Sequence, residues 1–311
     1  MNNTPTNAIV VAVGPDGHDA AVAFAVAEAR RTERPLHVVH VLERLTAYSF
    51  VSHDGIVEAA RATLDEATAQ AERLAGQDVE VTSELVTDGW IVDELVKHTE
   101  GASLLVLEHR ALTRANGAFG GSTVHSVAGR ARVPVISVPK GWLADGPVKG
   151  VVTAAVQDAT EAAVLLRAGF VEAEARQARL VVLHAWWLSS GYDVVVVDDA
   201  MREEYEKEFR QELEPVLAPL RAEHPGVDVE VIVRHGPRVE AVLDAGEVSD
   251  LLVLARRHHL LPLGSHLGPV ARAALGHSTS PVLVTPEAGA PAAQQYSEIL
   301  ATIGRRPEAA S

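Results

Sequence analysis

The sequence predicts an α/β protein built from two tandem copies of one domain, each a doubly wound parallel sheet of five strands. The first observation is a repeat, because Leu104-Leu105-Val106-Leu107 recurs 147 positions later as Leu251-Leu252-Val253-Leu254. Gly121 and Gly268 keep the same separation. The second is that short apolar runs alternate with helical segments in both halves, which is typical of a parallel sheet covered by helices on both faces. The third is length, because 311 residues suffice for two domains of ordinary size.

The first copy opens with Ile9–Val13, an apolar run that Gly14-Pro15-Asp16-Gly17 ends in a turn. This is the pattern of a buried parallel strand. By the same criteria, further strands of this copy are expected at Leu36–Val41, Val79–Val86, Leu104–Leu107 and Val135–Val138. Helical periodicity and alanine content predict its helices at Ala20–Arg31, Val57–Leu74, Trp90–His98 and Thr123–Arg130.

The second copy follows the same order. Its strands are expected at Val151–Val156, Leu180–His184, Val227–Val233, Leu251–Leu254 and Val282–Thr285. Its helices are expected near Thr160–Arg176, Asp199–Glu223, Arg238–Ala245 and Pro269–Leu275. The junction between the copies falls in Gly141 to Pro147, a stretch that contains Gly, Pro and Asp and has no apolar periodicity. We therefore assign residues 1–144 to domain 1, 145–287 to domain 2 and 288–311 to a C-terminal tail.

The charge balance argues against polyanionic partners. The chain has 42 acidic and 27 basic residues, a formal net charge of -15, and such a charge repels nucleic acids and anionic membranes. Its one dense basic patch, Arg256-Arg257-His258-His259, is interpreted as a solvated loop. Cysteine is absent, and neither a signal peptide nor a run of about 18 apolar residues is present. We expect a soluble cytoplasmic protein that binds neither nucleic acid nor membrane.

The loop after the fourth strand is the first place to look for a ligand site. Ligands of doubly wound sheets bind beyond the carboxyl ends of the strands, where the strand order reverses. Thirteen residues, 108–120, precede Gly121-Ser122-Thr123 in the first copy, and thirteen, 255–267, precede Gly268-Pro269 in the second. A glycine at a helix start lets backbone N–H groups approach a phosphate, and the positive end of the helix favours the anion.

The two copies end in similar patterns, Gly121-Ser122-(x)11-Pro134-Val135 and Gly268-Pro269-(x)11-Pro281-Val282. With this loop and these endings, the chain resembles the universal stress protein family in its tandem two-domain form. The resemblance extends from Ile9 to Pro286. It implies a Rossmann-like fold of the adenine-nucleotide-binding type. It also implies that the two copies pack as an internal pseudo-dimer through their last strands. Members that bind ATP carry Gly-x2-Gly-x9-Gly-Ser/Thr in this loop, and an aspartate just after strand one meets the nucleoside.

The resemblance implies nucleotide-binding residues in domain 1 at Asp16, Val41, Gly120, Gly121, Ser122 and Thr123, with Gly268 as the degenerate equivalent in domain 2. Both copies depart from the ATP-binding pattern. The two earlier glycine positions are occupied by Glu108 and Ala111 in domain 1, and by Ala255 and His258 in domain 2. Glu108 places a carboxylate near phosphate oxygens, while Pro269 lacks the N–H and the hydroxyl of Ser122. Asp16 stands two residues later than the aspartate of the family pattern, at a position that also suits a turn-forming aspartate.

Other polar and aromatic residues have structural explanations. Asp158 is interpreted as a helix cap before Thr160. Packing is the expected role of two pairs, His40 with His184 and Trp186 with Trp187, although the tryptophans could instead stack on a purine. The remaining histidines lack the i,i+4 spacing and nearby carboxylate of a metal site, among them His53, His98, His266 and His277. We expect no metal and no catalytic residue, because no nucleophile elbow, P-loop lysine or carboxylate pair is present.

Three candidate functions are compatible with the fold class. The first is a non-catalytic stress-response protein that acts through binding or signalling, with degenerate nucleotide sites and unidentified protein partners. The second is an ATP-binding member that hydrolyses ATP slowly in domain 1 only. The third, an enzyme such as a ligase or an electron-transfer flavoprotein, needs catalytic segments for which the short loops leave no room. We favour the first, with further self-association of the pseudo-dimer left open.

Overall fold

The computed structural model describes residues 3–42, 53–109, 120–188, 193–256 and 267–286. Within these ranges, the chain divides into two compact units between Pro147 and Val148. The predicted boundary lies three residues earlier, between residues 144 and 145. The predicted tail and most of both thirteen-residue loops, with Ala111, His258 and His266, lie outside the described residues.

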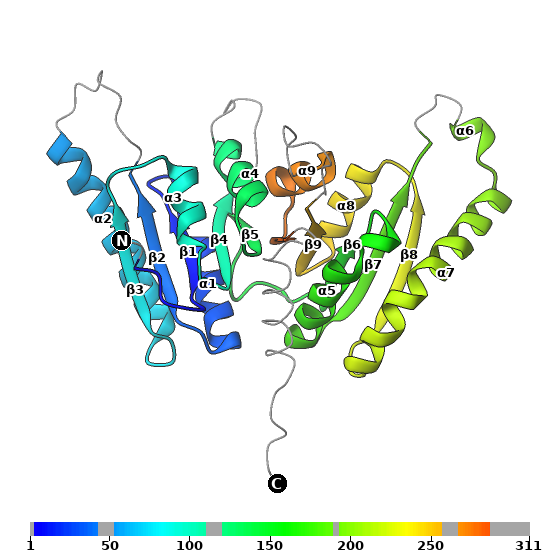
Figure 1. Ribbon diagram of the computed structural model, residues 1–311, viewed down its shortest axis with the longest axis horizontal. Coiled ribbons are helices and arrows are strands. Elements are labelled where there is room, and N and C mark those ends of the chain that lie inside the picture. Colours follow the sequence, from blue (N-terminus) through cyan, green and yellow to red (C-terminus); the bar gives the residue numbers. More distant parts are fainter. Residues whose placement is uncertain (1–2, 43–52, 110–119, 189–192, 257–266, 287–311) are drawn as a thin grey trace, which may run out of the picture. The chain divides into compact units, whose positions relative to one another are not determined.

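Domain 1 is a parallel sheet with strand order β3-β2-β1-β4-β5 (Figure 1). Its strands are β1 (Ile9–Val13), β2 (Leu36–Val41), β3 (Val81–Val86), β4 (Leu104–His109) and β5 (Val135–Pro139). Its helices are α1 (Asp19–Thr32), α2 (His53–Ala75), α3 (Ile91–His98) and α4 (Gly120–Arg130). Helix α1 packs beside α2 and α3 beside α4, and right-handed crossovers place the two pairs on opposite faces of the sheet. Because strand order reverses at β1, the carboxyl ends of β1 and β4 flank the crevice.

Domain 2 repeats this topology with strand order β8-β7-β6-β9-β10. Its strands are β6 (Val151–Ala155), β7 (Arg179–Trp186), β8 (Val229–His235), β9 (Leu251–Ala255) and β10 (Val282–Thr285). A 3-10 turn, η1 (Ala159–Glu161), precedes its helices α5 (Ala163–Arg176), α6 (Asp193–Val196), α7 (Asp199–Glu223), α8 (Arg238–Glu247) and α9 (Pro269–His277). The predicted fold class, two copies of a doubly wound five-stranded parallel sheet, is therefore confirmed.

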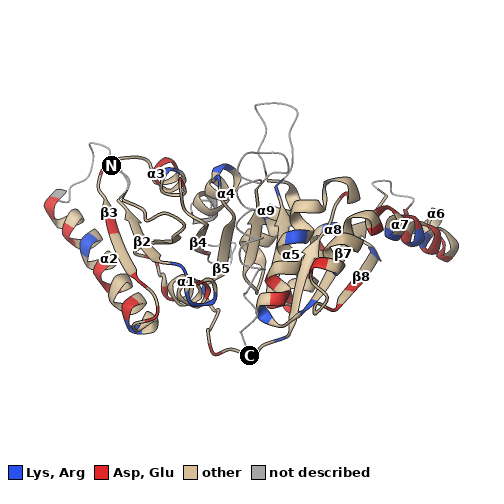
Figure 2. Ribbon diagram, turned by 60° about the horizontal axis from the view of Figure 1, so that its bottom comes forward, with Lys and Arg blue, Asp and Glu red and all other residues tan. Residues whose placement is uncertain are grey.

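The strands form the cores because most of their side chains are apolar on both faces. Every residue of β2 and β10 is buried, as are four of the five residues of β1. Parallel strands covered by helices on both sides require this continuous apolar pattern. The outer helices differ, since α2 and α7 carry interspersed acidic and basic side chains (Figure 2). On α7, ion pairs such as Arg210 with Glu206 mark a solvated face.

The differences from the expected elements are local. Strand β7 is longer than predicted because it pairs with β8 through to Trp186 and His235. Helix α6 was not predicted, since four residues are too few to show a helical period. The predicted helix at Thr160–Arg176 is divided into η1 and α5. No helix in the described ranges combines the length and the apolar composition needed to cross a membrane.

Candidate functional site

A cavity of about 520 Å³ opens at the carboxyl ends of the domain 1 strands. It is lined by the turn after β1, by the end of β2, by the end of β4 and by the first turns of α3 and α4. This is the crevice that the strand order predicts, and its volume lies in the range of about 300–1,000 Å³ that is usual for small-molecule sites. Domain 1 therefore provides room for a ligand of nucleoside size.

The turn after β1 supplies one wall of the cavity. Asp16 lies in this turn and lines the cavity, and its backbone carbonyl accepts a hydrogen bond of 3.3 Å from Lys140 Nζ. Gly17 has φ of 128°, and a Cβ added to it would lie 3.1 Å from Oε1 of Glu108. Glycine is required there both by the backbone conformation and by the close approach of the carboxylate. The turn thus brings Asp16 and Glu108 to the same cavity.

Glu108, near the end of β4, points at the start of α1. Its Oε2 accepts hydrogen bonds from the backbone N–H groups of Ala20 (3.1 Å) and Ala21 (3.5 Å). The N-cap residue His18 makes no side-chain cap, so Glu108 satisfies amides that would otherwise have no partner within the helix. Burial is the largest cause acting on this carboxyl and raises the pKa of Glu108, although the two amides and Lys140 oppose it. The Glu108 carboxylate therefore occupies the N-terminal end of α1, the end of a helix that favours an anion.

The remaining predicted contacts are distributed around the same cavity. Val41 at the end of β2 and Thr123 in α4 both line it. Gly120, Gly121 and Ser122 begin α4, but their surroundings, including those of the Ser122 side chain, are not described. The fold thus gathers Asp16, Val41 and Thr123 at one crevice, and their role in nucleotide binding stays a prediction.

The corresponding cavity of domain 2 is much smaller, about 100 Å³. Arg238 begins α8 where domain 1 has Ile91 at the start of α3, and its Nε donates to the Ala185 carbonyl over 3.2 Å. Ala185 stands where domain 1 has Val41. The arginine side chain therefore lies at the end of β7, in the wall of this cavity. Gly268 lines this cavity and caps α9 with Pro269 at the first helical position.

Domain 2 also caps its first helical turn differently. Asp158 Oδ1 accepts hydrogen bonds from the backbone N–H of Thr160 (2.8 Å) and from its hydroxyl (2.7 Å). These bonds are the largest causes that lower the pKa of Asp158. The predicted cap is confirmed. Ala255, at the Glu108 position, has no side-chain acceptor, and α5 begins without a side-chain cap.

The model of the universal stress protein family matches residues 5–139 and 150–286. The chain belongs to this family. The two matched segments are the two sheets described above, so the protein is a tandem universal stress protein and the predicted resemblance is confirmed.

Solved structures with the same fold include a universal stress protein from Archaeoglobus fulgidus DSM 4304. It is 17% identical, with a TM-score of 0.61, and the match covers 90% of this chain and 96% of that one. A protein of unknown function from Pseudomonas aeruginosa PAO1 is 18% identical with a TM-score of 0.61, covering 96% and 98% of the two chains. At these identities the likeness extends to the fold of this universal stress protein and no further.

The paired histidines of this universal stress protein pack as expected. His40 Nδ1 contacts the Val13 carbonyl at 2.7 Å, and His184 Nδ1 contacts the Val156 carbonyl at 3.0 Å. Each imidazole thus ties the second strand of its domain to the end of the first. Trp186 is buried against Tyr205, with ring centroids 4.2 Å apart, so packing explains it as predicted.

Sequence reasoning missed three features of this universal stress protein. It did not identify the α1 amides as the partners of Glu108, nor Arg238 as the side chain that narrows the second cavity. It also held that His98 has no nearby carboxylate, which is wrong, because Glu84 Oε2 lies 3.3 Å from His98 Nε2. None of these contacts has a spacing signal, since each joins elements that only the sheet topology brings together.

Proposed function

We propose that this universal stress protein is a non-catalytic binding protein of the stress response. In this proposal, domain 1 takes a nucleoside or a similar small uncharged ligand and binds ATP only weakly. Domain 2 binds no nucleotide and contributes through its fold and surface. The observation that carries the proposal is the ionisable carboxylate of Glu108 in the wall of the domain 1 cavity.

The charge of Glu108 opposes a triphosphate in two ways. Its carboxylate already accepts the first amides of α1, so these donors are not available to a phosphate. Its negative charge also repels one: unit charges about 4 Å apart interact by roughly 4 kcal/mol at an effective dielectric near 20. Attraction to the N-terminus of α4, on the order of 1 kcal/mol, does not cancel this. We therefore expect ATP to bind domain 1 with a Kd above about 100 μM.

The alternative is an ATP-binding protein that hydrolyses ATP slowly in domain 1. The size of the cavity and the positions of Val41 and Thr123 on its wall favour this reading. It requires a bound triphosphate to displace or neutralise the Glu108 carboxylate, for example through Mg²⁺. The two readings predict opposite results for ATP in the unmodified protein.

Isothermal titration calorimetry with adenosine and with ATP separates them. Glu108→Gln removes the charge but keeps an oxygen that can accept from the α1 amides. Its matched control is Glu100→Gln, which removes an exposed carboxylate of the same domain outside the cavity.

We expect Glu108→Gln to raise ATP affinity by about tenfold to a hundredfold and to leave adenosine affinity within about threefold. Glu100→Gln should change neither. The proposal is wrong if the unmodified protein binds ATP with a Kd below about 10 μM, or if Glu108→Gln gives no gain. It also fails if adenosine binds to none of the three proteins.

A further inference from the structure

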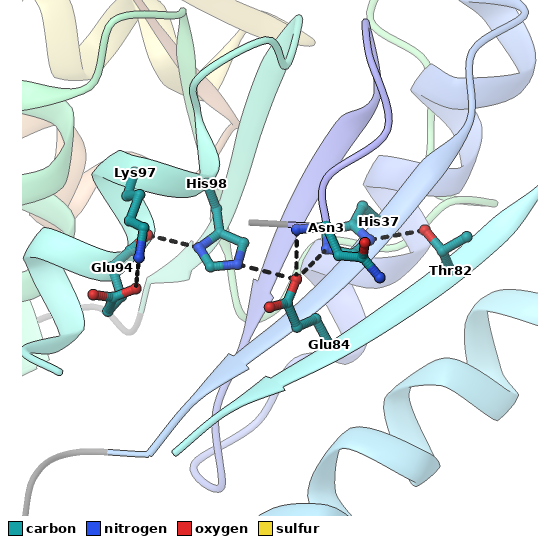
Figure 3. Close-up of polar contacts among 7 residues, drawn as sticks. All are labelled: Asn3, His37, Thr82, Glu84, Glu94, Lys97 and His98. Carbon is teal, nitrogen blue, oxygen red and sulfur yellow. Dashed lines mark hydrogen bonds and ion pairs between the residues drawn. The ribbon is translucent and has the colours of Figure 1, made fainter. Parts of the chain in front are cut away.

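Three side chains of domain 1 converge at a place that is separate from the cavity (Figure 3). His37 comes from β2, Glu84 from β3 and His98 from the last position of α3. Glu84 Oε2 lies 3.7 Å from His37 Nε2 and 3.3 Å from His98 Nε2, and one ligand atom from each of the three residues lies within 4.8 Å of the others. Thr82 and Glu84 of β3 pair in register with residues 37 and 39 of β2. Paired residues of neighbouring strands point to the same face, so Thr82 and Glu84 lie with His37 on the face of the sheet that α3 covers.

The hydrogen bonds behind the two imidazoles fix where their protons lie. His98 Nδ1 contacts the Glu94 carbonyl at 2.8 Å, and a carbonyl can only accept, so Nδ1 carries the proton. His37 Nδ1 contacts the Thr82 hydroxyl at 2.8 Å, and that hydroxyl donates to the Leu36 carbonyl. This leaves its oxygen to accept from His37 Nδ1. Both Nε2 atoms of the neutral rings therefore present a lone pair to the Glu84 carboxylate.

The two Nε2 atoms are buried without a hydrogen-bond partner. His37 and His98 are each 1% exposed. Two imidazole lone pairs and a carboxylate oxygen are three acceptors facing one point. The Asn3 backbone N–H donates to the carboxylate oxygen, but the two Nε2 atoms receive no hydrogen bond. Buried polar atoms are normally satisfied, and a cation at their common point would satisfy all three together.

We propose that His37, Glu84 and His98 bind one divalent transition-metal ion, with Zn²⁺ as the best match. Two ligands at about 2.0–2.2 Å from a tetrahedral zinc lie roughly 3.4 Å apart. The distances of 3.3 and 3.7 Å from Glu84 Oε2 to the two Nε2 atoms are close to that value. Two imidazoles and one carboxylate suit zinc and its first-row neighbours, whereas magnesium and calcium prefer oxygen ligands alone.

The surroundings supply the other parts of a metal site. The Glu94 carbonyl and the Thr82 hydroxyl orient the two imidazoles from behind, as the outer partners of metal-bound histidines do. The Glu84 side chain is 23% exposed, which gives an ion a route of entry and leaves a fourth position for solvent. Its Oε2 also accepts a hydrogen bond of 3.2 Å from the Asn3 backbone N–H. A metal ion bound to Glu84 would therefore be linked to the N-terminal segment through this carboxylate.

Domain 2 shows that the fold itself does not require this polar cluster. By strand register and by the 147-residue repeat, the corresponding positions are Val181, Ile232 and Ala245. All three are apolar, so domain 2 forms the same topology without an imidazole at these positions. The cluster is thus an addition specific to domain 1 and is independent of the nucleotide proposal.

The test uses the untagged full-length chain, freed of metal with a chelator and titrated with Zn²⁺ by calorimetry. We expect one Zn²⁺ per chain, and we expect Glu84→Gln and His98→Gln each to lower the affinity more than about hundredfold, because loss of an outer partner alone costs about 10- to 100-fold. Thr82→Val, which removes only an outer partner, should fall in that smaller range. Zn²⁺ should raise the Tm of the unmodified protein but not that of Glu84→Gln.

Two controls identify the source of any binding. His235→Asn removes a second histidine that contacts a carboxylate, Asp193 at 3.0 Å, and should leave zinc binding unchanged. The double variant His258→Ala, His259→Ala tests the basic patch of the sequence. Unchanged zinc affinity in Glu84→Gln and His98→Gln, or loss of binding only in the double variant, would overturn the proposal.

A measurement on the unmodified protein does not depend on the folding of any variant. Co²⁺ in place of Zn²⁺ should give the strong visible bands of a four-coordinate ion. Histidine ¹⁵N NMR should show zinc-induced shifts at Nε2 of His37 and His98 and at no other ring. Weak six-coordinate Co²⁺ bands, or shifts at other histidines only, would contradict the assignment.

Discussion

In domain 1, the first amides of α1 are capped by Glu108, which comes from β4 and lies 88 positions away from Ala20. In domain 2, Asp158 caps the 3-10 turn η1 from two positions before Thr160, and the N-cap residue of α5, Ala162, makes no side-chain cap. The end of β9 carries Ala255 in place of Glu108, so no carboxylate of that strand lies in the domain 2 cavity wall. Both cavities have a carboxylate in their walls, but only the carboxylate in domain 1 comes from the fourth strand and caps the first long helix.

The two cavities also differ in size for a local reason. An apolar residue, Ile91, begins α3 in domain 1, while Arg238 begins α8 in domain 2 and reaches the Ala185 carbonyl. Domain 1 keeps an open but negatively charged crevice, and domain 2 has a nearly filled one. In the proposed function, each copy therefore disfavours a triphosphate for a different reason.

The largest effect expected from this comparison is on stability. Glu108→Ala should destabilise domain 1 by about 2 kcal/mol, because it leaves two helix amides without their acceptor. Asp158→Ala should destabilise domain 2 by about 1 kcal/mol, the usual effect of losing a cap on the surface. Urea unfolding followed by tryptophan fluorescence separates the domains, since Trp90 and Trp142 report on domain 1 and Trp186 and Trp187 on domain 2.

The control for this experiment is Glu108→Gln, whose amide oxygen still accepts from the helix. It should be at least as stable as the unmodified protein at pH 7. If Glu108→Ala and Glu108→Gln lose the same stability, the capping role assigned to Glu108 is incorrect.

A smaller effect is expected in the pH dependence. Burial raises the pKa of Glu108 in the folded protein above its usual value of about 4.3. The folded state then binds more protons than the unfolded state between the two values, so the contribution of Glu108 is most favourable below about pH 4 and is lost as the pH rises through the raised pKa. Relative to Glu108→Gln, the unmodified protein should therefore lose stability between about pH 4 and pH 7. A constant difference over this range would show that the pKa of the carboxyl is not raised.

The sequence predicts most of the fold because the fold depends on local patterns. The apolar runs of β1, β2 and β10 have the same bounds in the structure as in the prediction. The prediction is weakest where an element is short or where a cap interrupts a helix, as at α6 and η1.

The candidate sites were less predictable because they depend on contacts across the sheet. Asp16 and Thr123 could be assigned to one crevice from the family resemblance and from the rule that ligands bind where strand order reverses. The approach of Glu84 to His98 depends on the register of β3 against β2 and on where α3 ends, and neither can be read from the spacing of the residues. The same holds for Arg238, which in the sequence is an ordinary charge at the start of a helix.

The central claim is that domain 1 holds the only cavity of the two that admits a nucleoside. Residue-resolved NMR of the ¹⁵N-labelled full-length protein during an adenosine titration tests this most directly. The account predicts amide shifts at Val41, Thr123 and the Asp16 turn, and none at the matching positions Ala185 and Val270. Equal shifts in both domains, or shifts confined to domain 2, would contradict it.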